Sequence, residues 1–262
     1  MDRPRFSANT GFLWTDRPFP NRLRAAAAAG FDAVEFHDEA QRHDPALIRA
    51  ILDETGLPVC GLNVRMGETA GCAALPGQED QARRDVDDAL RIAETLAAGA
   101  VHVLAGRAAD GGDRAQYLRV LRHALDGLDP GGDRVILIEP ICRAAMPDYA
   151  LPDIASAAAI VAEIARPRLK ILFDCFHVAM QDGDVMARFA AHAGQIGHVQ
   201  IASVPGRNEP GDADRLDLAA LIAQMQALGY AGAFGCEYRP RGTVEAGLGW
   251  RRPFEAPPAQ RS

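Results

Sequence analysis

The chain has 262 residues, 48% of them hydrophobic, so it is long enough for one large α/β domain or two small ones with a full apolar core. Its formal net charge of −7 gives a nucleic-acid partner no electrostatic support. No apolar run has the length of a membrane span, and the charged N-terminus MDRPRF lacks the apolar core of a signal peptide. The five scattered cysteines form no CxxC pair, which is typical of reduced thiols in a cytoplasmic protein.

Short β-rich runs alternate with longer Ala- and Leu-rich segments along the chain. Helical patterns at 21–30, 44–56, 81–99 and 217–229 each end in glycine, as helix C-termini commonly do. This alternation predicts a mainly parallel sheet with helices outside, and eight such units in this length are typical of a (β/α)8 TIM barrel. The eight strands are predicted at Phe6–Ala8, Ala33–Phe36, Val59–Leu62, Ala100–Leu104, Val135–Glu139, Leu169–Asp174, His198–Ile201 and Ala233–Glu237.

The main alternative to a barrel is a doubly wound open sheet. Such a sheet would normally carry a Gly-rich phosphate loop after its first strand, and residues 6–15 contain none. We therefore predict a single-domain barrel over residues 1–252, followed by a loose tail at 253–262. Two longer loops, at 61–77 and 105–113, follow strand ends where barrel active sites are built, so they are candidate covers for a substrate.

Polar side chains mark the ends of the last four predicted strands. Because side chains alternate along a strand, each polar end shares a face with residues two positions away, and the opposite face is apolar and suited to the helix layer. A single acidic residue at a strand end is as often a helix cap or one half of a salt bridge. Four polar groups in phase on consecutive strands favour one shared site at the barrel mouth. These groups are Glu139, Asp174, Gln200 and Glu237.

Three carboxylates that converge in a barrel repel one another, and a divalent cation relieves that repulsion. Ligation by oxygen alone, with no cysteine and no ligating histidine, favours Mg²⁺ or Mn²⁺ over Zn²⁺. His177 and Arg207 are candidate substrate-binding residues, since a guanidinium can hold a carboxylate by a forked pair of hydrogen bonds. His102 and Glu35 can face inward and are candidates to support the ligands from behind, although buried structural roles are at least as common. Cys175 and Cys236 are interpreted as packing residues.

Several segments together resemble the hydroxypyruvate isomerase family of xylose isomerase-like barrels, from about residue 5 to residue 252. They are RFSAN (5–9), CAALPG (72–77), HVLAG (102–106), IEPI (138–141), DCFH (174–177), GHVQIASVPGRNEPG (197–211), GCEYRPRG (235–242) and TVEAGLGW (243–250). The resemblance implies a (β/α)8 barrel that interconverts hydroxypyruvate and 2-hydroxy-3-oxopropanoate. It implies Glu139 and Glu237 as the catalytic pair. It also implies that Glu139, Asp174, Gln200 and Glu237 bind a divalent metal, and that His177 and Arg207 contact substrate.

Three departures from the family pattern lie on the expected substrate rim, at 35–44, at 62–68 and at Cys142, where relatives often carry Asn. They do not change the residues expected to carry the isomerisation, but they leave the identity of the substrate open. The alternatives are a 2-oxo-tetronate isomerase, a ketose 3-epimerase and a non-catalytic barrel that binds sugar acids. An endonuclease of this fold would want a His-rich trinuclear zinc site, which seven histidines and an acidic net charge disfavour. The expected partner is a small sugar acid. Relatives are often homo-oligomers, and no segment of this sequence fixes an interface.

Overall fold

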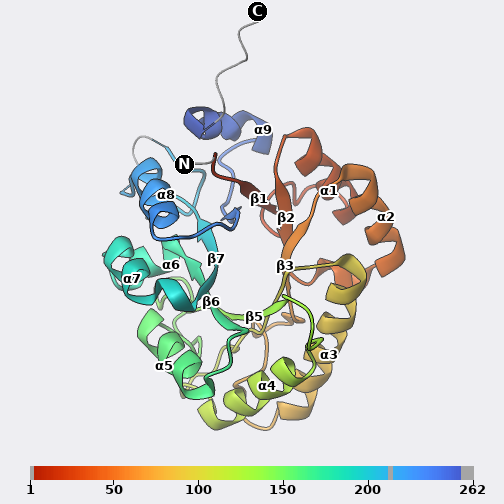
Figure 1. The fold of residues 1–262 in the computed structure, drawn as a ribbon, viewed down its shortest axis with the longest axis vertical. Coiled ribbons are helices and arrows are strands. Elements are labelled where there is room, and N and C mark those ends of the chain that lie inside the picture. The colour runs from red at the N-terminus through yellow and green to blue at the C-terminus, as the bar shows by residue number, and fades with distance from the viewer. Residues whose placement is uncertain (1–2, 212–214, 255–262) are drawn as a thin grey trace, which may run out of the picture.

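Eight parallel strands close into a barrel in chain order, with helices around the outside (Figure 1). The structure, a computed structural model, describes residues 3–211 and 215–254. β8 pairs with β1 from Phe6–Phe234 to Ala8–Cys236, which closes the ring and confirms the predicted (β/α)8 TIM barrel. The strands are β1 (Phe6–Asn9), β2 (Ala33–Phe36), β3 (Val59–Asn63), β4 (Ala100–His102), β5 (Val135–Ile138), β6 (Leu169–Asp174), β7 (Ile196–Ile201) and β8 (Phe234–Cys236).

The helices are α1 (Phe19–Ala28), α2 (Pro45–Thr55), α3 (Glu79–Leu96), α4 (Arg114–Asp126), α5 (Ile154–Ile164), α6 (Cys175–Gln181), α7 (Val185–His192), α8 (Leu218–Ala227) and α9 (Val244–Gly247), with 3-10 turns η1 (Glu39–Arg42), η2 (Ala193–Gln195) and η3 (Leu248–Phe254).

Local sequence sets the ends of many of these helices. An aspartate side chain caps the N-terminus of α2, α4, α5, α6, α7 and α8 by accepting a backbone N–H. Gly56 is the C-cap of α2 in the left-handed conformation, whereas the C-cap of α3 is Ala97 rather than the predicted Gly99.

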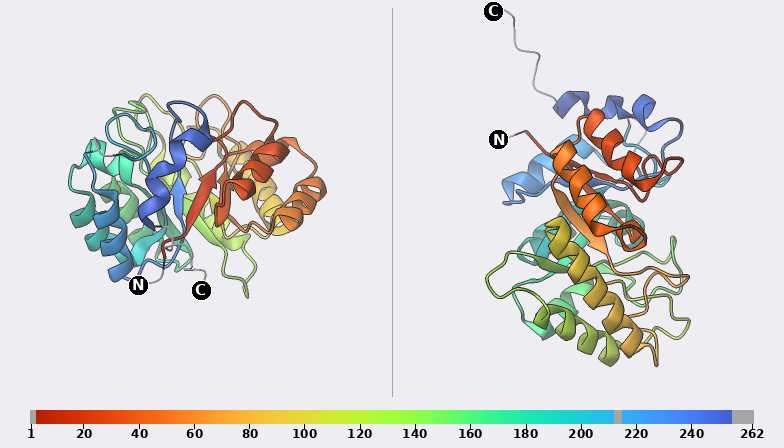
Figure 2. Two further views of the ribbon diagram at one scale, coloured as in Figure 1. Left: turned by 90° about the horizontal axis from the view of Figure 1, so that it is seen from above. Right: turned by 90° about the vertical axis from the view of Figure 1, so that its right-hand side faces the viewer.

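The strands divide their side chains between two cores, as the alternation predicts. Ala100, Leu137 and Leu172 form a small cluster inside the barrel, and Ile136 and Ile171 belong to the large core between the strands and the helices. The left view of Figure 2 looks across the barrel, with the loops that follow the strands gathered at its upper end. In the part of the chain that the structure describes, no helix is both long enough and apolar enough to span a membrane.

The loose tail was predicted to begin at residue 253, which is too early in the sequence. Pro253 and Phe254 belong to η3, while residues 255–262 lie outside the described residues. The ring of Phe254 packs edge-on against Phe6, with 5.5 Å between the ring centroids, and lies 6.3 Å from the ring of Trp250. The last described turn is therefore part of the packing around β1, because its aromatic side chain covers the start of that strand.

The Phe254→Ala variant is expected to lower the free energy of unfolding by about 1–3 kcal/mol, because it removes a partly buried ring from an aromatic cluster. Chemical denaturation followed by circular dichroism measures this change. Arg252→Ala is the matched control, since this neighbouring side chain is exposed, and it is expected to unfold like the wild type. An unchanged free energy of unfolding for Phe254→Ala would show that η3 contributes nothing to stability.

Candidate functional site

Four buried polar side chains meet at the C-terminal mouth of the barrel, each from the end of a different strand. Glu139 follows β5, Asp174 ends β6, Gln200 lies near the end of β7 and Glu237 follows β8. Their exposed fractions are 6%, 1%, 4% and 6%. Asp174 and Gln200 are direct register partners on neighbouring strands. The structure thus places the four predicted residues at the mouth, where barrel active sites are built.

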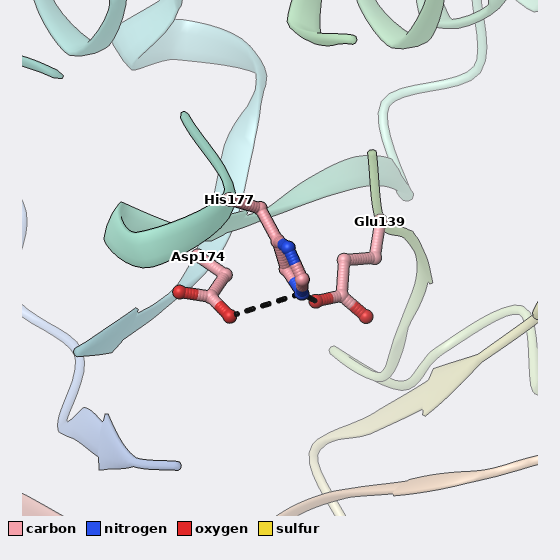
Figure 3. Close-up of side chains that lie close together, drawn as sticks. All are labelled: Glu139, Asp174 and His177. Carbon is pink, nitrogen blue, oxygen red and sulfur yellow. Dashed lines mark ion pairs between the residues drawn. The ribbon is translucent and has the colours of Figure 1, made fainter. Parts of the chain in front are cut away.

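Three donor atoms, one each from Glu139, Asp174 and His177, lie within 4.8 Å of one another (Figure 3). The His177 Nε2 lies 3.5 Å from Asp174 Oδ2 and 3.7 Å from Glu139 Oε1. These separations are long for hydrogen bonds, and one small cation could contact all three atoms. Glu139 Oε1 is buried and has no hydrogen-bond partner, as expected of an atom that serves a ligand. His177, predicted to contact substrate, also offers a nitrogen donor to this group.

The electrostatics of these carboxylates also fit a cation site. Burial raises the pKa of Glu139 well above its ordinary value, and the nearby charges of Glu237 and Asp174 add to the effect. Burial raises the pKa of Asp174 to about 7, although the charge of Arg207 acts in the opposite direction. Two buried carboxylates whose charged forms are disfavoured gain the most from a bound divalent cation.

Arg207 lies between two of the carboxylates. Its Nη2 donates to Asp174 Oδ2 at 3.1 Å and to Glu237 Oε2. Its guanidinium lies 4.9 Å from the ring centroid of Phe12 and 5.1 Å from that of Phe176, so cation–π contacts hold it in place. The Nε atom is buried and has no hydrogen-bond partner. Arg207 therefore pairs with the carboxylate cluster and keeps one buried donor available for another acceptor.

Glu237 is the most strongly ionised of the three carboxylates. Burial disfavours its charged form, but the charge of Arg207 and the hydrogen bond from His37 outweigh burial and lower the pKa of Glu237 to about 2. The pKa of the Glu139 carboxyl, on the other side of the cluster, moves in the opposite direction. The two predicted catalytic glutamates thus lie in different electrostatic environments within one pocket.

The two predicted supporting residues, His102 and Glu35, lie behind the cluster. His102 Nδ1 lies 3.1 Å from Asn63 Oδ1, and its Nε2 lies 3.8 Å from Glu139 Oε2 without a hydrogen-bond partner. Burial lowers the pKa of His102 to about 3, so its ring is neutral near pH 7. Glu35 accepts a hydrogen bond of 2.8 Å from the Gln200 amide nitrogen. Both residues therefore touch predicted ligands from below the mouth.

Three polar contacts in the site were not predicted. Asn9 Nδ2 donates to Glu237 Oε1 at 3.1 Å, and His37 Nε2 lies 3.2 Å from the same oxygen. Cys142 Sγ lies 3.3 Å from His177 Nδ1. Asn9 ends β1 and His37 follows β2, so the strand-end rule would have found them if it had been applied to the first strands too. Cys142 lies in a loop, and no sequence pattern signals its contact.

The cysteines are free thiols, as the sequence predicts. All five are free, and Cys175 and Cys236 are 1% and 0% exposed, which confirms that they are packing residues. Burial raises the pKa of both thiols well above the ordinary value, so neither is a reactive thiolate.

A pocket of about 480 Å³ opens above the cluster, within the range of small-molecule sites. The 61–77 loop forms part of its wall through Met66 and Ala70. This loop is fastened to the chain after β4, since Ala74 N donates to Ala105 O at 2.7 Å. The 105–113 loop bonds back to it, since Arg107 N donates to Thr69 O and Asp113 N donates to Ala74 O, both at 2.7 Å. The Arg107 side chain also donates from Nε to Asp148 Oδ1 at 2.9 Å.

Known proteins resemble the chain over almost its entire length. A family model described as xylose isomerase-like TIM barrel matches residues 23–254. A 2-oxo-tetronate isomerase of Cupriavidus necator is 40% identical over 259 residues, covering 96% of this chain and 98% of the relative. A protein of Homo sapiens named as a hydroxypyruvate isomerase is 37% identical over 264 residues, covering 95% of both. A solved structure from Brucella melitensis, described as an AP endonuclease of family 2, has a TM-score of 0.90 at 34% identity and covers 97% of this chain and 100% of that one.

Proposed function

The chain belongs to the xylose isomerase-like TIM barrel family, and from this premise we propose that it is an isomerase of short sugar acids. Its substrate would be a 2-oxo acid with a hydroxyl group on the neighbouring carbon. The proposal depends chiefly on one observation. A single pocket holds two buried glutamates, a group suited to a cation and an arginine with an unpaired buried donor.

The proposed reaction moves a proton between adjacent carbons through a cis-enediolate. It needs a base, an acid and positive charge near the developing oxyanion. Glu139 and Glu237 reach the mouth from β5 and β8, which are three places apart in the barrel order. From these positions they can serve different carbon atoms of one substrate, so that one removes the proton and the other returns it.

The carboxylate of the substrate is the natural partner for Arg207. The Nε of this residue is buried in the pocket wall and has no hydrogen-bond partner, so an acceptor oxygen from a bound acid would satisfy it. His177 lines the same pocket, and burial lowers its pKa to about 3, so it would offer a neutral imidazole to a substrate oxygen.

The residues that would hold a divalent cation are Glu139, Asp174, Gln200 and Glu237, with His177 Nε2 beside them. The unpartnered oxygens of Glu139 and Gln200 fit this role. A set dominated by oxygen donors favours Mg²⁺ or Mn²⁺. When bound, such an ion supplies Lewis-acid stabilisation of negative charge on substrate oxygens.

The resemblance found in the sequence implied hydroxypyruvate as the substrate. We now expect the four-carbon 2-oxo-tetronate to react faster than hydroxypyruvate. The more similar of the two named isomerases carries the 2-oxo-tetronate name. The endonuclease description of the Brucella melitensis structure does not fit this chain. The net charge of −7 works against binding of a phosphate backbone, and the group that could hold a metal contains one histidine.

A substrate panel followed by proton NMR tests the proposed function. With Mg²⁺ or Mn²⁺ present, the purified protein is expected to convert 2-oxo-tetronate, hydroxypyruvate or both, and to leave neutral ketoses unchanged. Epimerisation of neutral ketoses without turnover of the acids would instead identify a ketose 3-epimerase. Tight binding of the acids without turnover would identify a non-catalytic binding barrel.

A further inference from the structure

Glu35 lies inside the barrel, beneath the candidate cation site, and is 4% exposed. Its carboxylate accepts hydrogen bonds from residues of two other strands. The donors are Ser7 Oγ at 2.7 Å, Asn9 Nδ2 at 3.2 Å, His198 Nε2 at 2.7 Å and Gln200 Nε2 at 2.8 Å. The side chain is thus held from β1 and from β7 at the same time, which leaves it little freedom to turn.

The contact with Glu35 decides which end of the Gln200 amide faces the site. The Gln200 Nε2 donates to Glu35 Oε1 at 2.8 Å, so the amide nitrogen faces the Glu35 carboxylate. The amide oxygen is then directed away from Glu35, and it is buried without a hydrogen-bond partner.

The neighbouring strand β8 is shaped to keep the Glu35 carboxylate in this place. Gly235 is the register partner of Gln200. A Cβ atom built on Gly235 would lie 2.5 Å from both carboxylate oxygens of Glu35, closer than real contacts allow. Any side chain at position 235 would therefore push the carboxylate away from the Gln200 amide.

We propose that Glu35 is a positioning residue that fixes the Gln200 amide with its oxygen directed toward the candidate cation site. The inference rests on the proposed function, because it assigns Glu35 a role toward the cation that the site would hold. Without Glu35 the amide could turn by half a rotation and present its NH₂ group, which repels a cation. Groups that orient metal ligands in this way commonly control metal affinity.

The first test uses the wild-type protein without metal and needs no change at position 35. The side-chain NH₂ group of Gln200, assigned by its disappearance from the spectrum of Gln200→Met, is expected to show slow hydrogen exchange in ¹⁵N NMR, because it donates to a buried carboxylate. Fast exchange of this group would overturn the inference, whatever the activity of the enzyme.

The second test measures Mn²⁺ affinity by calorimetry. Affinity is expected to fall about 10- to 100-fold in Glu35→Ala and in Gly235→Ala, the usual cost of losing a group that orients a metal ligand. Ser7→Ala is the control, because it removes another hydrogen bond to Glu35 and leaves the Gln200 contact in place. We expect it to keep the wild-type affinity. If Glu35→Ala does not fold, Gly235→Ala carries the test, since it displaces the carboxylate and deletes no polar atom.

The outcomes separate this inference from the proposed function. Wild-type Mn²⁺ affinity in the folded variants would show that Glu35 has a structural role only, and would leave the proposed isomerase untouched. Failure of the wild type to bind Mn²⁺ or Mg²⁺ would overturn both the cation site and the role of Glu35. Loss of affinity in the two variants but not in Ser7→Ala is the result that the inference expects.

Discussion

The Glu237→Gln variant is expected to lose about 10²- to 10⁴-fold of the isomerase activity, the usual contribution of a general acid or base. The amide keeps the shape of the side chain but can neither take up nor deliver the proton. It also removes the charge that pairs with Arg207. The rate of conversion of the sugar acid, measured by proton NMR with saturating Mg²⁺, reports the loss.

The matched control for this variant is Glu163→Gln, the same chemical change on the exposed surface of α5. Its only described partner is Arg114, an exposed ion pair that contributes little to stability. It is expected to keep wild-type activity and stability. Full activity in a folded Glu237→Gln protein would remove Glu237 from the acid/base pair and would leave the proposed mechanism without one of its two proton-transfer groups.

Asp174→Asn is expected to lower the affinity for Mn²⁺ by more than about 100-fold, since even groups that merely orient a metal ligand are worth 10- to 100-fold. The two carboxylate oxygens of Asp174 have separate roles, and the change to asparagine keeps one role and removes the other. Its Oδ1 caps α6 by accepting the Phe176 N–H at 2.8 Å, and asparagine is an equally good cap. Its Oδ2 faces His177 and Arg207, and there an NH₂ group cannot bind a cation. Calorimetry measures the affinity.

Asp184→Asn provides the control for Asp174→Asn. Asp184 caps α7 in the same way, with its Oδ1 2.9 Å from the Ala187 N–H, and it lies outside the cluster that could hold a metal. Its replacement by asparagine is expected to leave Mn²⁺ affinity unchanged. If both variants bind Mn²⁺ like the wild type, Asp174 is a helix cap and not a ligand, which is the ordinary structural role of such an acid.

Much of the fold could be predicted because strands carry a two-residue period and helices end in recognisable residues. The alternation in VILIE placed Leu137 inside the barrel and Ile136 outside, and the structure shows both. The same rule brought Glu139 and Asp174, on neighbouring strands, to one mouth. The predicted end of the third helix missed Ala97, because a left-handed alanine carries no sequence signal.

The contacts within the site could not be predicted, because they join distant segments through loop conformations. Arg207 reaches Asp174 and Glu237 from a backbone with φ 51°, which sequence does not predict for an arginine. The hydrogen bond between Glu35 and Gln200 joins residues 165 positions apart. Sequence placed Glu35 and Gln200 at strand positions that face inward, and only the closed barrel decides which partner each one meets.

Solvent deuterium incorporation tests the central claim most directly. The wild-type protein is given 2-oxo-tetronate or hydroxypyruvate in D₂O with Mg²⁺ or Mn²⁺, and the product is examined by proton NMR. Proton transfer by two separate glutamates predicts metal-dependent product that carries deuterium at the carbon that received the proton, because the returning group exchanges with solvent. Product without solvent deuterium would indicate a direct hydride shift and contradict the acid/base pair. Absence of both turnover and exchange with either acid would contradict the assignment of this pocket as a sugar-acid isomerase site.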